Sequence, residues 1–73
     1  MEDYTDIIRK IVLMKPKDEN SNNQLRYLLL AGRAFEVARQ IMDYTNMDMP
    51  AEDVEKLVLD LKKVKLEMQQ FCD

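Results

Sequence analysis

The sequence predicts an all-α fold, because it has few turn-forming residues and its apolar residues recur at helical spacing. Its 73 residues include one Gly and two Pro, whereas a sheet protein of this size needs many turns. A chain this short buries only about 60% of the surface that it exposes when unfolded, which leaves room for a single domain over residues 1–73. Charged residues make up 34% and apolar types 47%, the composition of a soluble globular domain.

A short amphipathic helix is predicted over residues 4–14. Its apolar residues recur at helical spacing with polar residues between them: Tyr4, Ile7, Ile8, Ile11 and Val12. Pro16 ends this helix, because the residue before a proline is disfavoured in the α conformation. The polar stretch 15–23 is typical of a connecting loop, and Ser21 or Asn22 can cap the next helix.

The second helix is predicted from about Asn23 to Thr45, and its apolar residues form three stripes. The first is a coiled-coil-like seam of Tyr27, Ala31, Ala34, Ala38 and Ile41. The second and third each repeat every seven residues: Leu28, Phe35 and Met42, then Leu30, Val37 and Tyr44. A single chain of this length has too few elements to cover all three stripes. The small residues of the seam, with Gly32 nearby, would let another helix approach closely.

A third helix follows a second break in the chain, where Pro50 suits the first turn of a helix. Glu52 and Asp53 then fall in that turn, where the helix dipole favours carboxylates. Leu59 and Leu66, seven residues apart, are additional candidates for a subunit contact. The remaining apolar residues form a heptad stripe to the end of the sequence: Val54, Leu57, Leu61, Val64, Met68 and Phe71.

The short break between the two long helices forces them antiparallel. The predicted architecture is therefore a short N-terminal helix plus an antiparallel hairpin of two long helices. Contiguous exposed apolar patches are uncommon on soluble monomers, so the excess apolar surface predicts assembly into a symmetric homo-oligomer.

Composition excludes most catalytic and metal chemistry. The chain has no His and a single cysteine, Cys72, so a zinc site lacks ligands and a Ser or Cys nucleophile lacks its base. We expect no enzyme activity, no catalytic residue, no metal site and no cofactor. A lone cysteine cannot close an internal disulfide, which favours a reducing compartment. The chain begins with the acidic Met1-Glu2-Asp3 and its apolar runs are too short for a membrane anchor, so we expect a cytoplasmic protein.

Charge is distributed unevenly along the chain. The formal net charge of −3 argues against duplex DNA or RNA as a partner. Positive charge is concentrated between Arg9 and Arg33, where a small anion could bind. An ordinary solvated helix surface is the simpler interpretation of the same residues.

One constellation within this basic region is a candidate binding site. A Pro-Lys-Asp turn at 16–18 precedes Arg26 and Tyr27 at the start of the second helix, where free backbone N–H groups favour anions. Arginine can bind phosphate or stack on a base, and tyrosine offers a π face. Alternatively, Tyr27 belongs to the core and Lys17 and Arg26 are solvated, and the residues alone favour that alternative.

A wider pattern resembles a known family. It consists of Pro16-Lys17-Asp18, Gln24, Arg26-Tyr27, Leu30, Ala34, Glu36-Val37-Ala38 and Ile41. On these residues the chain resembles the phage anti-CBASS family, small helical proteins that bind and sequester cyclic oligonucleotide messengers. The resemblance covers about residues 16–68, and the third helix lacks the Ser-Arg-Glu and Trp-Ala-Asn segments of the family.

The resemblance implies a non-enzymatic protein that forms a symmetric oligomer, commonly of six chains, and binds cyclic di- or trinucleotides at subunit interfaces. In the cytoplasm of an infected host cell, sequestration would keep an antiviral effector switched off. The resemblance assigns ligand binding to Lys17, Arg26 and Tyr27, and local charge adds Lys15 and Arg33. A second hypothesis is a helical protein-interaction module, such as a phage inhibitor or adaptor that uses its surplus apolar faces on a host protein.

Overall fold

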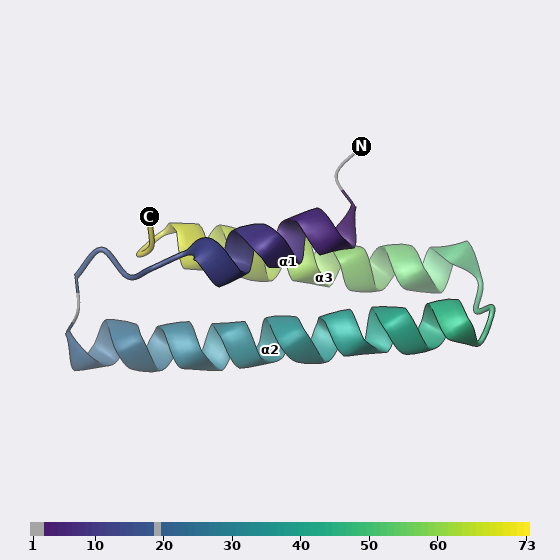
Figure 1. Ribbon diagram of the computed structural model, residues 1–73, viewed down its shortest axis with the longest axis horizontal. Helices are drawn as coiled ribbons and strands as arrows, with labels where there is room; N and C mark the ends of the chain where they lie inside the picture. The colour runs from purple at the N-terminus through teal and green to yellow at the C-terminus, as the bar shows by residue number, and fades with distance from the viewer. Residues whose placement is uncertain (1–2, 19) are drawn as a thin grey trace.

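The computed structural model describes residues 3–18 and 20–73, and these residues form three α-helices (Figure 1). The helices are α1 (Tyr4–Leu13), α2 (Ser21–Asn46) and α3 (Ala51–Gln69). No strand occurs in the described ranges, so the predicted all-α class is confirmed. The acidic start Met1-Glu2, and Glu19 in the first loop, lie outside the described residues.

Helix α1 is capped at its start and ends before the first proline. The Asp3 carboxylate accepts hydrogen bonds from the backbone N–H of Tyr4 at 2.7 Å and from the hydroxyl of Thr5 at 3.1 Å. At the other end Met14 is already extended, with φ −71° and ψ 144°. The helix therefore ends one residue earlier than predicted, and Pro16 follows in an extended segment.

Helix α2 begins two residues before the predicted start at Asn23, and its capping residue is neither Ser21 nor Asn22. The cap is Asn20, whose Oδ1 accepts a hydrogen bond from the backbone N–H of Asn23 at 2.9 Å. The loop folds back so that Nδ2 of Asn20 donates to the Asp18 carboxylate at 3.2 Å and Nδ2 of Asn23 donates to the Asp18 carbonyl at 3.1 Å. The predicted cap at Ser21 or Asn22 was wrong, because these contacts with Asp18 hold Asn20 at the position just before the first turn of α2.

A left-handed residue closes the end of α2. Asp48 has φ 54°, and the N–H of Met49 donates to the carbonyl of Tyr44 at 3.0 Å. This bond satisfies a carbonyl that the last turn of the helix leaves without an internal partner.

Helix α3 begins at Ala51, directly after this turn. Pro50 is its N-cap residue, with φ −54° and ψ 142°, and so precedes the first turn in which it was predicted. Glu52 and Asp53 lie in the first turn, as predicted.

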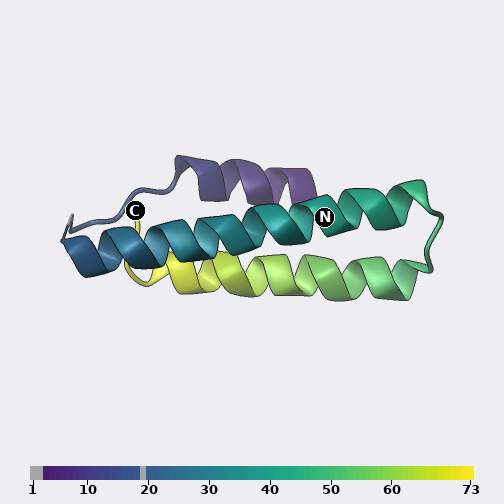
Figure 2. The same ribbon diagram turned by 90° about the horizontal axis from the view of Figure 1, so that it is seen from below.

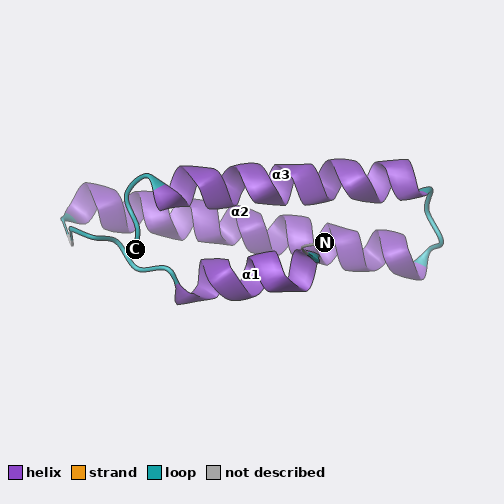
Figure 3. Ribbon diagram, turned by 90° about the horizontal axis from the view of Figure 1, so that it is seen from above, coloured by secondary structure: helices purple, strands orange, loops and turns teal. Residues whose placement is uncertain are grey.

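The two long helices lie side by side and run in opposite directions (Figure 1). Helix α1 packs against both of them (Figures 2 and 3). The molecule is elongated, with extents of 42 × 22 × 15 Å. Because α1 has 10 residues and α2 has 26, the first helix covers only part of the hairpin's length.

The core lies where the three helices meet. Its largest fully buried side chains come from all three: Ile7 and Ile11 from α1, Ile41 from α2, and Leu61 and Met68 from α3. Each helix therefore contributes one apolar face to a single core.

The apolar stripes of α2 are covered to different degrees. In the seam, Ala34 and Ile41 are fully buried, and the other seam residues and the third stripe are buried or half-buried. The second stripe stays exposed: Leu28 is 66%, Phe35 52% and Met42 54% exposed. It is uncovered because α1 and α3 both pack on other sides of α2 (Figure 2).

Candidate functional site

The loop before α2 is held against the residues that follow α3. The N–H of Lys17 donates to the carbonyl of Phe71 at 2.9 Å, and the N–H of Asp73 donates to the carbonyl of Lys15, also at 2.9 Å. These bonds join two short segments in an antiparallel bridge between Pro16 and Cys72. The loop that carries both predicted lysines is therefore fixed to the C-terminal end of α3.

Arg26 reaches the same end of α3. Its guanidinium carbon lies 4.5 Å from the centre of the Phe71 ring, a cation–π contact. Phe71 is only 7% exposed, so its ring is a fixed platform, while Arg26 itself is exposed. The contact orients a guanidinium group that stays accessible to a ligand.

Two basic residues, Arg26 and Lys17, act on the neighbouring Cys72 thiol. Burial, and after it the charge of Asp73, raise the pKa of the Cys72 thiol above its ordinary value of 9.0. Arg26 and Lys17 act in the opposite direction on the same pKa. The Lys17 N–H bonds to the Phe71 carbonyl and the Arg26 guanidinium lies over the Phe71 ring, so the two basic residues meet at Phe71. Lys17 and Arg26 therefore form a local positive cluster.

Tyr27 lies beside this cluster but on a different side of α2, since adjacent residues leave a helix about 100° apart. With Pro16, Gln24 and Leu28 it lines a groove of about 220 Å³. Tyr27 is half-buried, so part of its ring remains accessible. The structure thus divides the predicted site into a cationic part at Phe71 and an aromatic groove next to it.

The two basic residues added from local charge lie at the periphery. Lys15 is exposed in the loop, and its carbonyl is held by Asp73. Arg33 is exposed seven residues beyond Arg26, which places it about 10 Å further along the same side of α2. Among the described residues, no basic side chain lines the groove of Tyr27.

Phe71 is the residue of this site that the sequence analysis missed. The sequence places it only in the heptad stripe of the third helix, and nothing in its local sequence connects it with Arg26. The one available signal was the antiparallel arrangement of the long helices, which brings the start of α2 to the end of α3.

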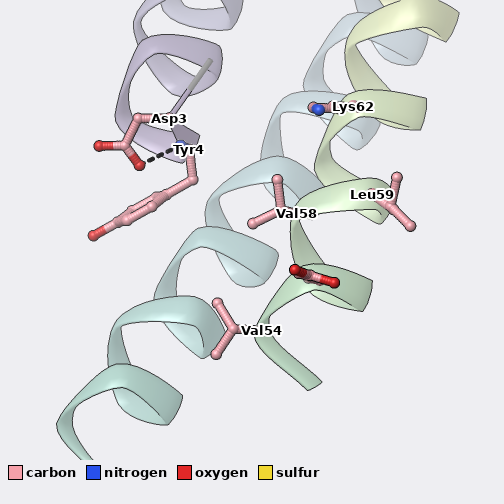
Figure 4. Close-up of a pocket in the computed structure, with 7 residues that line it drawn as sticks. Asp3, Tyr4, Val54, Val58, Leu59 and Lys62 are labelled. Carbon is pink, nitrogen blue, oxygen red and sulfur yellow. Dashed lines mark hydrogen bonds between the residues drawn. The ribbon is translucent and has the colours of Figure 1, made fainter. Parts of the chain in front are cut away.

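A larger groove, of about 520 Å³, lies between α1 and α3 (Figure 4). Tyr4 lies on one side of this groove, and Val54, Val58, Leu59 and Lys62 lie on the other (Figure 4). Its lining is largely apolar and includes two carboxylates and one amine: Asp3, Tyr4, Val54, Glu55, Val58, Leu59 and Lys62. With more acidic than basic groups, this groove is a poorer site for an anion than the cluster at Lys17 and Arg26.

The described part of the chain contains neither a candidate metal-binding cluster nor a candidate membrane-spanning helix. Over residues 3–18 and 20–73, no three acidic or cysteine side chains gather closely enough to hold a metal ion. None of the described helices combines the length and the apolar content that crossing a bilayer requires.

Comparison of the chain with protein-family models, with curated proteins and with solved structures gives no significant match.

Proposed function

We propose that this protein binds and sequesters cyclic di- or trinucleotides without catalysis, as its resemblance to the phage anti-CBASS family implies. The observation that supports the proposal is that Lys17 and Arg26 meet at Phe71, next to the half-buried Tyr27 and its groove. Cations beside an aromatic ring match the two recognisable parts of a cyclic nucleotide, its phosphates and its bases.

Different residues contact different parts of the nucleotide. The ammonium group of Lys17 and the guanidinium group of Arg26 bind the phosphates, and the Phe71 ring holds the guanidinium in place. The ring of Tyr27 stacks on a base at the groove. Lys15 and Arg33 add positive charge at the periphery of the Lys17 and Arg26 cluster.

The size of the groove favours a site that is completed by a second subunit. Its volume of about 220 Å³ is below the roughly 300–1,000 Å³ of ordinary small-molecule sites. A cyclic dinucleotide extends beyond such a groove, and a neighbouring protomer would enclose the remainder. The proposed protein is therefore a symmetric homo-oligomer, six chains in the resembling family, that acts in the host cytoplasm to keep an antiviral effector switched off.

Calorimetric titration with a panel of cyclic di- and trinucleotides tests this function, with linear dinucleotides as controls. We expect at least one cyclic member to bind much more tightly than its linear counterpart. Removing one partner of a partly desolvated charged pair costs about 2–5 kcal/mol, so Lys17→Ala and Arg26→Ala should each lower the affinity at least tenfold.

Lys63→Ala is the matched control, because Lys63 is an exposed lysine on α3 away from the cluster. It should leave the affinity unchanged, and circular dichroism should show equal helix content in all variants. Unaltered affinity in both site variants would contradict the placement of the site. Absence of binding across the whole panel would contradict the function.

The exposed apolar surface favours the second candidate function, a helical protein-interaction module that acts as an inhibitor or adaptor of a host protein. Large apolar side chains lie exposed on every helix, among them Leu13 at 72% and Leu66 at 59%. A monomeric protein that binds no nucleotide of the panel would favour this candidate over the first.

A further inference from the structure

The groove between α1 and α3 exists because α1 is much shorter than the helix beside it. Helix α1 has 10 residues and α3 has 19, and α1 begins beside the middle of α3, so the first turns of α3 extend beyond it (Figures 1 and 3). Val54 and Val58, one turn apart on α3, are half-buried there, and Tyr4 lies across from them (Figure 4). The groove measures about 520 Å³, within the roughly 300–1,000 Å³ of small-molecule sites.

Charged groups also line this groove, and more of them are acidic than basic. They are the carboxylates of Asp3 and Glu55 and the amine of Lys62, a formal charge of −1. The segments that form the groove extend this sign, because residues 3–6 and 51–62 together hold six acidic residues and two lysines. Their charge of −4 exceeds in magnitude the net charge of −3 of the whole chain. The field at the groove therefore attracts cations.

Asp3 and Tyr4 provide two positioned groups that a cation recognises. The Asp3 carboxylate is held by hydrogen bonds from the Tyr4 N–H at 2.7 Å and from the Thr5 hydroxyl at 3.1 Å. A carboxylate has about four acceptor sites, so these two bonds leave it able to accept hydrogen bonds from a ligand. The half-buried ring of Tyr4 offers a π face, which attracts a cation within about 6 Å.

We propose that this groove binds a small organic cation with an apolar body, such as an arylalkylammonium ion. The apolar body packs between the Tyr4 ring and the side chains of Val54 and Val58. The ammonium group donates a charge-assisted hydrogen bond to the Asp3 carboxylate, and the charge of Glu55 adds attraction. Lys62 has the same charge as the ligand and lowers its affinity. This site is separate from the proposed nucleotide site and takes ligands of the opposite charge.

Three probes of nearly equal size separate the effect of charge from that of apolar contact: phenylbutylamine, phenylbutanol and phenylbutyrate. Titration followed by the NMR signals of the Val54 and Val58 methyl groups measures each affinity at the groove itself. We expect the amine to bind about fivefold more tightly than the alcohol, since the alcohol lacks the cation–π and ionic contacts, and the carboxylate to bind most weakly. A carboxylate that binds as tightly as the amine would overturn the proposal. Unchanged valine signals with all three probes would overturn it as well.

Single substitutions then assign the charges. Asp3→Asn removes the carboxylate charge and keeps a side chain that caps a helix as well as Asp does. Asp3→Asn and Glu55→Gln should each lower the affinity for phenylbutylamine about two- to fivefold, as expected for an exposed ion pair, and leave the affinity for phenylbutanol unchanged. Lys62→Gln should raise the affinity for the amine by a similar factor. A loss of affinity in Lys62→Gln would contradict the sign of the site.

Glu67→Gln is the matched control, because it removes an exposed carboxylate of α3 that does not line the groove. It should leave the affinity for phenylbutylamine unchanged, and circular dichroism should show equal helix content in all variants. An equal loss of affinity in Glu67→Gln, Asp3→Asn and Glu55→Gln would show that only the overall charge of the protein matters, which would overturn the site. These titrations use no nucleotide, so their outcome is independent of the proposed nucleotide binding.

Discussion

At the scale of single residues, the turn between the long helices depends on a backbone conformation that few residues adopt. Asp48 has φ 54°, in the left-handed region. There the side chain of an L-residue crowds the backbone, at a cost of roughly 1–2 kcal/mol for most residues and less for Asp and Asn. Glycine has no such cost, since it lacks Cβ.

Asp48→Gly should therefore raise the free energy of unfolding by about 0.5–1 kcal/mol, and Asp48→Ala should lower it. Chemical denaturation of the three proteins measures the order. A glycine variant less stable than the alanine variant would contradict the left-handed conformation.

Cys72 links a single buried thiol to the pH dependence of stability. Burial first, then Asp73, raise the pKa of its thiol above 9.0. The folded state thus keeps the thiol proton at pH values where the unfolded chain has lost it. The resulting stabilisation is complete below pH 9.0 and disappears as the pH rises through the raised pKa.

The stability advantage of the wild type over Cys72→Ala should accordingly be constant at neutral pH and shrink in alkaline solution. Denaturation of both proteins over a pH series measures the difference, and the subtraction removes the effects that both proteins share. The buried thiol should also react slowly with a maleimide until the protein is unfolded. An advantage that grows with alkaline pH would show that the thiol pKa is lowered instead.

At the scale of helices, the caps decide where each element begins. The N-cap of α2 is Asn20, whose side chain accepts a hydrogen bond from the backbone N–H of Asn23. Asn20→Ala should lower the free energy of unfolding by about 1 kcal/mol, a typical cost of a lost N-cap. Asn22→Ala is the matched control, because it changes an exposed asparagine two residues further along that does not cap the helix. Equal losses in the two variants would contradict the observed start of α2.

The helices themselves were well predicted, and their ends less so. Apolar periodicity is a property of neighbouring residues, so each of the three helices was found from sequence. The ends depend on contacts across the loop, such as Asn20 and Asn23 with Asp18, and so α2 starts two residues earlier than expected. Pro50 was placed in the first turn because the sequence does not show whether proline is the last residue before a helix or the first within it.

At the scale of the whole molecule, the predicted self-association through the uncovered stripe of α2 can be tested by the dependence of stability on protein concentration. If folded chains associate through Leu28, Phe35 and Met42, association stabilises the folded state by mass action. The Tm of the wild type should therefore rise with concentration, whereas the Tm of Phe35→Glu should stay constant. Calorimetric scans over a concentration series provide the measurement. A constant Tm for the wild type would contradict self-association in this range.

Local sequence was sufficient for the helical class, for the three helices and for the heptad stripe of α3, because these depend on residues within a few turns of one another. Tertiary packing alone decided which stripe of α2 is covered, since all three are apolar and only the positions of α1 and α3 distinguish them. It also placed Phe71 in the candidate site: the Arg26 guanidinium lies on the Phe71 ring because the long helices run antiparallel, and the Lys17 N–H bonds to the Phe71 carbonyl. Phe71 is remote in sequence from Arg26 and Lys17, so no local sequence pattern indicates these contacts.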